Sequence, residues 1–139
     1  MSVRAADLTK DMPFIQSLLK NIDLSHIPLP EEIKNVNHQW FVFEQDGVIC
    51  GCVVVKKDRC EIGHLIVDPN FCRKGIGSKL VTTAVTFLQD TNNKQIWAQV
   101  RITNDKSIGL FEKNGFRQEK ILISQESPKV KLYKYILRK

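Results

Sequence analysis

Residues 60–80 constrain the fold of this chain more than any other stretch. Their apolar first part predicts a buried strand that ends at Asp68-Pro69. Residues 75–77, Gly-Ile-Gly, then open a helical pattern, so a strand, a tight turn and a helix follow one another. The first N–H groups of a helix lack intrahelical partners and glycine has no Cβ, so this turn can seat a phosphate group. Arg73 and Lys74 add two cations beside it.

Two common nucleotide-binding motifs do not fit this turn. A P-loop needs four residues between its first glycine and Gly-Lys-Ser/Thr, and residues 77–79 have the wrong order and lack that spacing. The dinucleotide fingerprint needs a third glycine where Leu80 stands. The stretch instead resembles the acyl-CoA-binding core of the GNAT superfamily of N-acetyltransferases. In that core, a strand ending near Val-x-Pro leads into Gln/Arg-x-x-Gly-x-Gly/Ala at a helix N-terminus.

The resemblance implies that this turn binds CoA. In the family, the backbone amides of the turn hold the CoA pyrophosphate. Carried over by position, this binding role falls on Cys72, Arg73, Lys74, Gly75, Ile76, Gly77 and Ser78. Cys72 stands where the family has Gln or Arg, which is a departure, but the turn amides do not depend on that side chain.

Residues 104–116 resemble a second family signature, Asn-x-x-Ala-x-x-Leu-Tyr-x-Lys-x-Gly-Phe. The resemblance implies that the Asn104 side chain helps to hold the pantetheine arm. Phe111 stands at the tyrosine that many members use as proton donor, so it can pack against CoA but cannot donate a proton. Three outcomes stay open: water or the amine's own proton neutralises the thiolate, Tyr133 or Tyr135 reaches in from the last strand, or the protein binds acyl-CoA without turnover.

The predicted strand at 60–67 carries the remaining site candidates. By resemblance, the N–H groups of Leu65, Ile66 and Val67 bind the pantetheine and the thioester. Glu61 occupies the position where a subset of the family carries its general base. His64 is the rival base, since its usual pKa suits proton transfer near neutral pH. Alternation along the strand places His64 on the face opposite Glu61 unless a bulge intervenes.

Composition narrows the classes of partner. The chain has 139 residues, which fits one domain spanning 1–139, and its net charge of +6 suits an anionic ligand such as CoA. The basic residues near the C-terminus alternate with apolar ones, as in a half-buried strand, and no nucleic-acid motif accompanies them. No apolar run approaches ~20 residues, so we expect no membrane span. The start lacks a signal-peptide pattern, which favours a cytoplasmic location.

The four cysteines, at 50, 52, 60 and 72, are expected to be reduced, as is usual in the cytoplasm. Cys50 and Cys52 are two apart in a predicted strand, too straight for a bridge between them. The histidines at 26, 38 and 64 show no metal-ligand spacing, so we expect no metal.

The remaining patterns complete an α/β fold. They predict strands at 2–5, 40–45, 48–56, 60–67, 95–103, 116–123 and 129–137, and helices starting at 9–11, within 23–37, at 75–77 and at 104–105. Pro13 is expected in the first turn of the first helix, Asp46-Gly47 in a hairpin turn, residues 91–93 at the end of the third helix, and Asn114-Gly115 at the end of the fourth. By resemblance, this is the GNAT fold, with a mixed, mostly antiparallel sheet of about seven strands and about four flanking helices. A V-shaped splay between the fourth and fifth strands would hold the pantetheine arm.

These features predict an N-acetyltransferase that moves an acetyl group from acetyl-CoA to a primary amine by direct transfer in a ternary complex. The alternative is a catalytically weak or inactive acyl-CoA sensor or partner subunit, which the departures at Cys72 and Phe111 favour. Nucleic-acid binding is disfavoured, because the basic residues do not interleave with exposed aromatic ones at a spacing that suggests stacking. The acceptor, a small molecule or a peptide amine, stays open, and exposed edge strands leave a homodimer open.

Overall fold

The computed structural model describes residues 2–22, 30–71, 75–89, 95–123 and 131–137. These residues form one seven-stranded sheet in the order β1-β2-β3-β4-β5-β7-β6, antiparallel throughout except for the parallel pair β4–β5. The elements are β1 Ser2–Ala5, α1 Leu8–Ile22, α2 Pro30–Ile33, β2 His38–Gln45, β3 Val48–Lys56, β4 Glu61–Val67, the 3-10 turn η1 Pro69–Phe71, α3 Ile76–Gln89, β5 Trp97–Arg101, α4 Asp105–Lys113, β6 Phe116–Ile123 and β7 Lys131–Leu137. The predicted fold class is confirmed.

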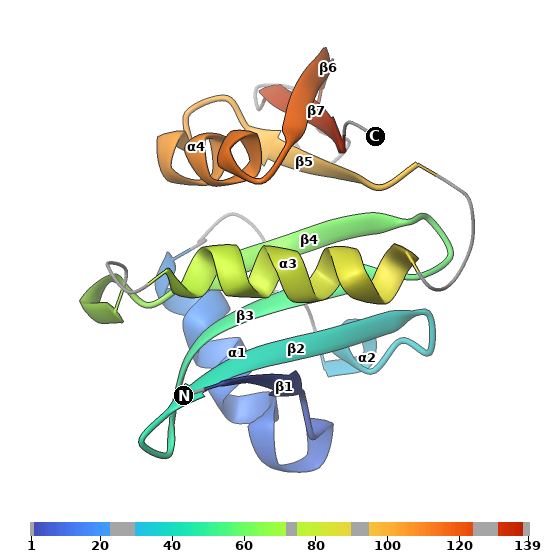
Figure 1. The fold of residues 1–139 in the computed structure, drawn as a ribbon. Coiled ribbons are helices and arrows are strands. Elements are labelled where there is room, and N and C mark those ends of the chain that lie inside the picture. The colour runs from blue at the N-terminus through green and yellow to red at the C-terminus, as the bar shows by residue number, and fades with distance from the viewer. Residues whose placement is uncertain (1, 23–29, 72–74, 90–94, 124–130, 138–139) are drawn as a thin grey trace.

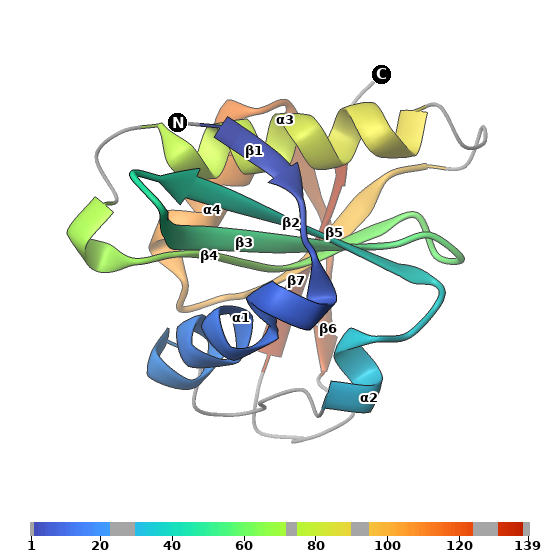
Figure 2. The ribbon, with the colours of Figure 1, turned by 90° about the horizontal axis from the view of Figure 1, so that it is seen from below.

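Helices cover both faces of the sheet (Figures 1 and 2). On one face, α3 and α4 pack over a core that includes Phe41, Val53 and Ile62. On the other face, α1 and α2 pack over a second core around Trp40 and Val54. Neighbouring residues of β2 and β3 therefore belong to different cores, as expected of strands buried on both sides. We call these the α3 face and the α1 face.

The central hairpin forms where it is predicted. Asp46 and Gly47 have φ values of 52° and 77°, the pair of positive angles that a type I′ turn requires. Gly115 follows α4 with φ of 91°, as an αL helix end. The predicted helix end at 91–93 and the first two residues of the strand predicted at 129–137 lie outside the described residues.

The first helix begins one to three residues before its predicted start at 9–11. The helix begins at Leu8 because the Asp7 side chain caps it, with Oδ1 accepting from the N–H groups of Thr9 (3.0 Å) and Lys10 (3.4 Å). Pro13 consequently lies in the second turn. Asp11, which sequence reasoning placed at the helix start, instead turns inward.

Asp11 joins the helix to the sheet through Arg4 of β1. The Arg4 guanidinium donates to both Asp11 carboxylate oxygens, at 2.7 and 3.2 Å, and to Glu44 Oε1 of β2 at 2.8 Å. Asp11 also accepts the Asp7 N–H at 2.8 Å. Its carboxylate is buried, and the hydrogen bonds from Arg4 lower the pKa of Asp11. Two neighbouring strands and the first helix are therefore tied at one point.

We predict that Arg4→Met lowers the free energy of unfolding at pH 7 by about 2 kcal/mol, because it leaves the Asp11 carboxylate buried without its cation. The folded pKa of Asp11 lies below its unfolded value, so this stabilisation exists above the unfolded pKa and is lost as pH falls through the folded pKa. Urea unfolding at pH 7 and at about pH 2.5 measures both effects. The control Glu44→Gln removes only a partly exposed ion pair and should cost under about 1 kcal/mol. An equal loss for Arg4→Met at both pH values would contradict the assignment.

Candidate functional site

The parallel strands β4 and β5 separate soon after they meet. They pair only at Glu61 with Trp97 and at Ile62 with Ala98. Beyond this point β5 continues to pair with β7, whereas β4 from Gly63 onward has no strand partner on this side among the described residues. Figure 1 shows the two strands diverging. The predicted V-shaped splay between the fourth and fifth strands is confirmed.

A β-bulge interrupts β4 inside the splay. Between the pairs Cys52–Ile66 and Val54–Gly63, β3 contributes one residue and β4 contributes two, His64 and Leu65. His64 has φ of 44°, in the left-handed region that side chains other than glycine seldom adopt. The bulge therefore changes which face the following side chains occupy.

The bulge brings His64 to the same face as Glu61. The His64 ring stacks on Trp40, with centroids 5.9 Å apart and an interplanar angle of 15°, and Trp40 belongs to the core of the α1 face. Glu61 pairs with Lys56, two residues along β3 from Val54 of that same core. A bulge was the one stated exception to the alternation of side chains along this strand, and the structure contains that bulge.

The bulged part of β4 presents two N–H groups to the splay. Asp68 N–H donates to Cys50 O of β3 at 2.8 Å. Because successive N–H groups of a strand point to opposite edges, that of Ile66 also faces β3, and those of Leu65 and Val67 face the side of β5. The Leu65 and Val67 side chains pack on the α3 face, and Ile66 lies in the core of the α1 face.

Glu61 is a buried carboxyl group with incomplete pairing. It is 4% exposed, with Oε2 4.0 Å from Lys56 Nζ and Oε1 3.9 Å from Arg59 Nη1. Neither cation is within hydrogen-bond distance, and Oε1 has no hydrogen-bond partner among the described residues. Burial raises the pKa of Glu61, while Lys56 and Arg59 oppose that rise. A carboxylate with a raised pKa is a stronger base than an exposed one.

The turn before α3 is open at Gly75. Gly75 is exposed, has φ of 69°, and a Cβ added there would meet no atom within 4 Å. Ile76 is buried in the core, so it anchors the first turn of the helix. The Ser78 hydroxyl accepts from Asn114 Nδ2 at 3.3 Å, which links α3 to the end of α4. Three of the predicted turn residues, at 72–74, lie outside the described residues.

Gly77 has a packing role that sequence reasoning missed. A Cβ at Gly77 would lie 2.7 Å from Leu110 Cδ2 of α4. The absence of a side chain therefore lets α4 approach α3. No signal within residues 75–77 could have revealed this, because the contact joins helices more than 30 residues apart in sequence.

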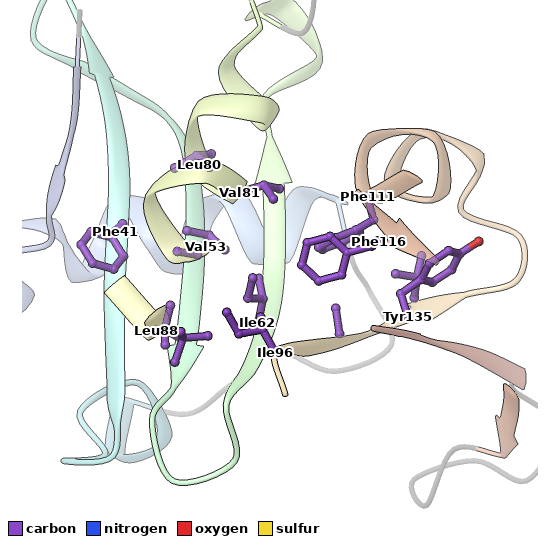
Figure 3. Close-up of a cluster of buried hydrophobic side chains, with 14 of the residues drawn as sticks. Phe41, Val53, Ile62, Leu80, Val81, Leu88, Ile96, Phe111, Phe116 and Tyr135 are labelled. Carbon is purple, nitrogen blue, oxygen red and sulfur yellow. The ribbon is translucent and has the colours of Figure 1, made fainter. Parts of the chain in front are cut away.

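The second signature forms α4 and part of its core. Asn104 caps the helix, with Oδ1 accepting from Ser107 N–H at 3.2 Å. Phe111 is 3% exposed, and its ring meets Phe116 edge to face at 5.1 Å (Figure 3). In this structure the Phe111 ring is therefore part of the hydrophobic core.

The two tyrosines of β7 differ in what their hydroxyl groups do. The Tyr135 hydroxyl donates to Glu112 Oε2 at 3.1 Å, and burial, reinforced by Glu112, raises the pKa of Tyr135 to about 12. Tyr133 packs against the same α3-face core and lies opposite Val100 of β5, in the part of β5 that has separated from β4. Of the two, Tyr133 is the one beside the splay.

Comparison with known proteins matches this geometry. Residues 8–116 match the model of the acetyltransferase (GNAT) family. The chain belongs to this family. It is 25% identical over 107 residues to the N-alpha-acetyltransferase of Sulfurisphaera tokodaii, a match covering 66% of this chain and 64% of that protein. It is 28% identical over 83 residues to the [ribosomal protein bS18]-alanine N-acetyltransferase of Escherichia coli K12, covering 58% and 56%. The chain thus spans less than two thirds of the length of these relatives.

A solved structure of the same fold is that of yncA from Salmonella typhimurium with its cofactor acetyl-CoA. It superposes with a TM-score of 0.80 at 18% identity, covering 99% of this chain and 92% of that one. The likeness shows that the same fold extends over nearly the whole chain. Among the described residues, no group of three or more His, Cys, Asp or Glu side chains could hold a metal ion. The described helices are all too short or too polar to cross a membrane.

We predict that Gly77→Ala and Leu110→Ala are energetically coupled. Alanine favours helix over glycine by up to about 1 kcal/mol, but at Gly77 the new Cβ displaces Leu110. Gly77→Ala should therefore be neutral or destabilising alone and stabilising once Leu110 is shortened. Urea unfolding of the two single variants and the double variant measures the coupling. Additive effects would show that Leu110 does not constrain Gly77.

Proposed function

We propose that this protein is an acetyl-CoA-dependent N-acetyltransferase that acts by direct transfer in a ternary complex. The observation that carries the proposal is the separation of β4 from β5 beside the open turn that begins α3. The separation leaves the N–H groups of Leu65 and Val67 without strand partners from β5. A thioester arm laid along β4 would provide acceptors for both.

Each part of the CoA molecule has a proposed binding site. The pyrophosphate would lie at residues 72–78, where exposed Gly75 precedes the unpaired N–H groups of α3. The pantetheine arm would follow Leu65, Ile66 and Val67. Since the Asn104 oxygen caps α4, we assign its amide nitrogen to the arm. Phe111 would support the arm from within the core.

Glu61 is the proposed base. The acceptor amine attacks the thioester carbonyl carbon, the C–S bond breaks, and the carboxylate takes a proton from the amine. Glu61 Oε1 is buried and unpaired among the described residues, which favours it over a solvated carboxylate. His64 on the same face is the second candidate. The thiolate would be protonated by water or by Tyr133, because the Tyr135 hydroxyl is bound to Glu112.

The proposed acceptor is the α-amino group of a peptide or protein. Both relatives compared above are named for acetylation of such groups, an N-alpha-amine in one and an alanine of a ribosomal protein in the other. The net charge of +6 also disfavours a polycationic acceptor such as a polyamine. The single domain over 1–139, the cytoplasmic location and the homodimer stay predictions.

A second candidate function is acyl-CoA binding without turnover. Phe111 favours it, because this ring is buried and carries no hydroxyl group where many family members have their proton donor. Both functions use the same CoA-binding site, but only the enzyme would turn over acetyl-CoA. An assay of thiol release with a panel of peptide amines and polyamines separates them, and release above the no-acceptor rate would support the enzyme.

We predict that Gly75→Asp weakens acetyl-CoA binding roughly tenfold or more, while Gly75→Asn has little effect. Both side chains tolerate positive φ, so the pair differs mainly in charge. A carboxylate about 4 Å from a phosphate costs about 1–4 kcal/mol, depending on the local dielectric. Titration calorimetry at low and moderate salt measures the binding. Equal affinities of the two variants would place the pyrophosphate elsewhere. If the native protein does not bind acetyl-CoA, both proposed CoA functions are contradicted.

Replacing Glu61 by Gln is expected to lower kcat roughly 10²- to 10⁴-fold and to remove the acidic limb of the pH–rate profile. The folded pKa of Glu61 is raised, so the native protein loses stability as pH rises through that pKa, whereas the Gln variant does not titrate. The stability of Glu61→Gln relative to the native protein should therefore increase from pH 5 to pH 8, measured by urea unfolding. An unchanged rate in this variant, with a large loss in His64→Gln, would assign the base to His64.

A further inference from the structure

Trp40 reaches across the sheet to His64. Trp40 lies on β2 opposite Val54 of β3, and Val54 lies opposite Gly63 of β4. The α-carbons of β2 and β4 are thus about 10 Å apart, so the indole must cross over β3 to stack on the His64 ring. A Cβ added at Gly63 would lie 3.4 Å from Val54 Cγ1 and 3.7 Å from Lys56 Cε, so the β3 side chains pack against this glycine beside His64.

The stack holds His64 in a costly conformation. A residue other than glycine in the left-handed region costs of order 1–3 kcal/mol and persists only where its surroundings fix it. Two contacts help to fix His64 in this conformation: the near-parallel stack on Trp40, and Cys52 Sγ, which lies 3.8 Å from His64 O. Trp40 itself is 2% exposed within the core under α1. The imidazole is therefore supported by a rigid partner.

The same face carries two buried polar atoms without hydrogen-bond partners among the described residues, Trp40 Nε1 and Glu61 Oε1. An unpaired buried polar group costs about 1–3 kcal/mol, and such groups cluster where a ligand completes the pairing. One atom is a donor and the other an acceptor. A polar ligand that offered both an acceptor and a donor could pair with these two atoms.

We propose that Trp40 is a positioning residue that fixes His64 on the acceptor side of β4, where His64 shares proton removal with Glu61. This inference rests on the proposed function. An acceptor amine arrives at neutral pH as an ammonium ion and must lose two protons before the amide is complete. One proton leaves before the nitrogen attacks and the other leaves as the C–S bond breaks. His64 and Glu61 take one each.

Among the described residues, the other charged groups near this part of the face include His38 of β2, whose pKa is lowered chiefly by burial, Lys56 of β3, and Asp58 and Arg59 in the turn before β4. From α1, Asp11 is held by Arg4. A variant of His38 therefore distinguishes the two described imidazoles.

The experiment is a double-mutant cycle on turnover with a peptide amine, using Trp40→Leu, His64→Gln and the double variant. We expect each single variant to lower kcat/KM roughly tenfold, and Trp40→Leu to have little further effect in the His64→Gln background. Trp40→Phe, which keeps a ring for the stack, should restore most of the rate. The control cycle replaces Phe41 by Leu, and should be additive with His64→Gln because Phe41 packs in the core of the α3 face, against Phe87.

A second arm needs no turnover and keeps the native Trp40. In a Trp97→Phe background, Trp40 is the only tryptophan of the chain. A protonated imidazole quenches a stacked indole, so the Trp40 emission should fall as the pH is lowered and the imidazole gains a proton. The titration should vanish in His64→Gln and persist in His38→Gln.

The outcomes distinguish a failure of the positioning role of Trp40 from a failure of the proposed acetyltransferase function. Equal losses from Trp40→Leu in both backgrounds, or an emission titration that survives His64→Gln, would overturn the positioning role while leaving acetyl transfer intact. Failure of the native protein to release thiol with any amine would overturn the proposed function, and the catalytic part of this inference with it. A non-additive cycle together with the His64-dependent titration supports the inference.

Discussion

The structure depends on one interrupted interaction, the parallel pairing of β4 with β5. Two residue pairs join the strands, enough to keep the two parts of the sheet continuous. Each strand then finds its hydrogen bonds elsewhere, β5 with β7 and β4 with β3. The backbone groups on the free edge of β4 would be costly to bury without partners, so the edge needs either water or a ligand. A linear ligand carrying its own amide groups, such as pantetheine, can complete the ladder.

The bulge in β4 gives this edge its chemistry. A regular strand would place Glu61 and His64 on opposite faces, with the sheet between them. The extra residue reverses the alternation, so both side chains face α1 while Leu65 and Val67 face α3. The proposed bases therefore stand on one side of the thioester path and the helices that would hold CoA stand on the other. In the proposed reaction, acceptor and cofactor would approach β4 from opposite faces.

Two buried carboxyl groups show how pairing geometry sets the direction of a pKa shift. Asp11 receives two hydrogen bonds from Arg4 at 2.7 and 3.2 Å, and its pKa is lowered. Glu61 has its cations at 3.9 and 4.0 Å, too far for hydrogen bonds, and burial raises its pKa. Direct hydrogen bonding to the charged form outweighs desolvation for Asp11, and desolvation dominates for Glu61. Asp11 fixes the fold, and Glu61 retains an unpaired oxygen.

The sequence by itself determined the order of the strands and helices, the Asp46-Gly47 hairpin and the turn at Gly75, because these depend on local periodicity and on backbone angles that few residues adopt. Local signals also named Glu61 and His64 as rival bases and placed them on opposite faces of the strand unless a bulge intervened. Only the tertiary structure decided that Glu61 and His64 share a face and that Gly77 serves helix packing. It also decided that the Tyr135 hydroxyl binds Glu112, and that Asp7 rather than a later residue caps α1. Nearly all of these depend on contacts between distant segments, such as Leu110 with Gly77 or Trp40 with His64, and such contacts leave no periodic trace in the chain.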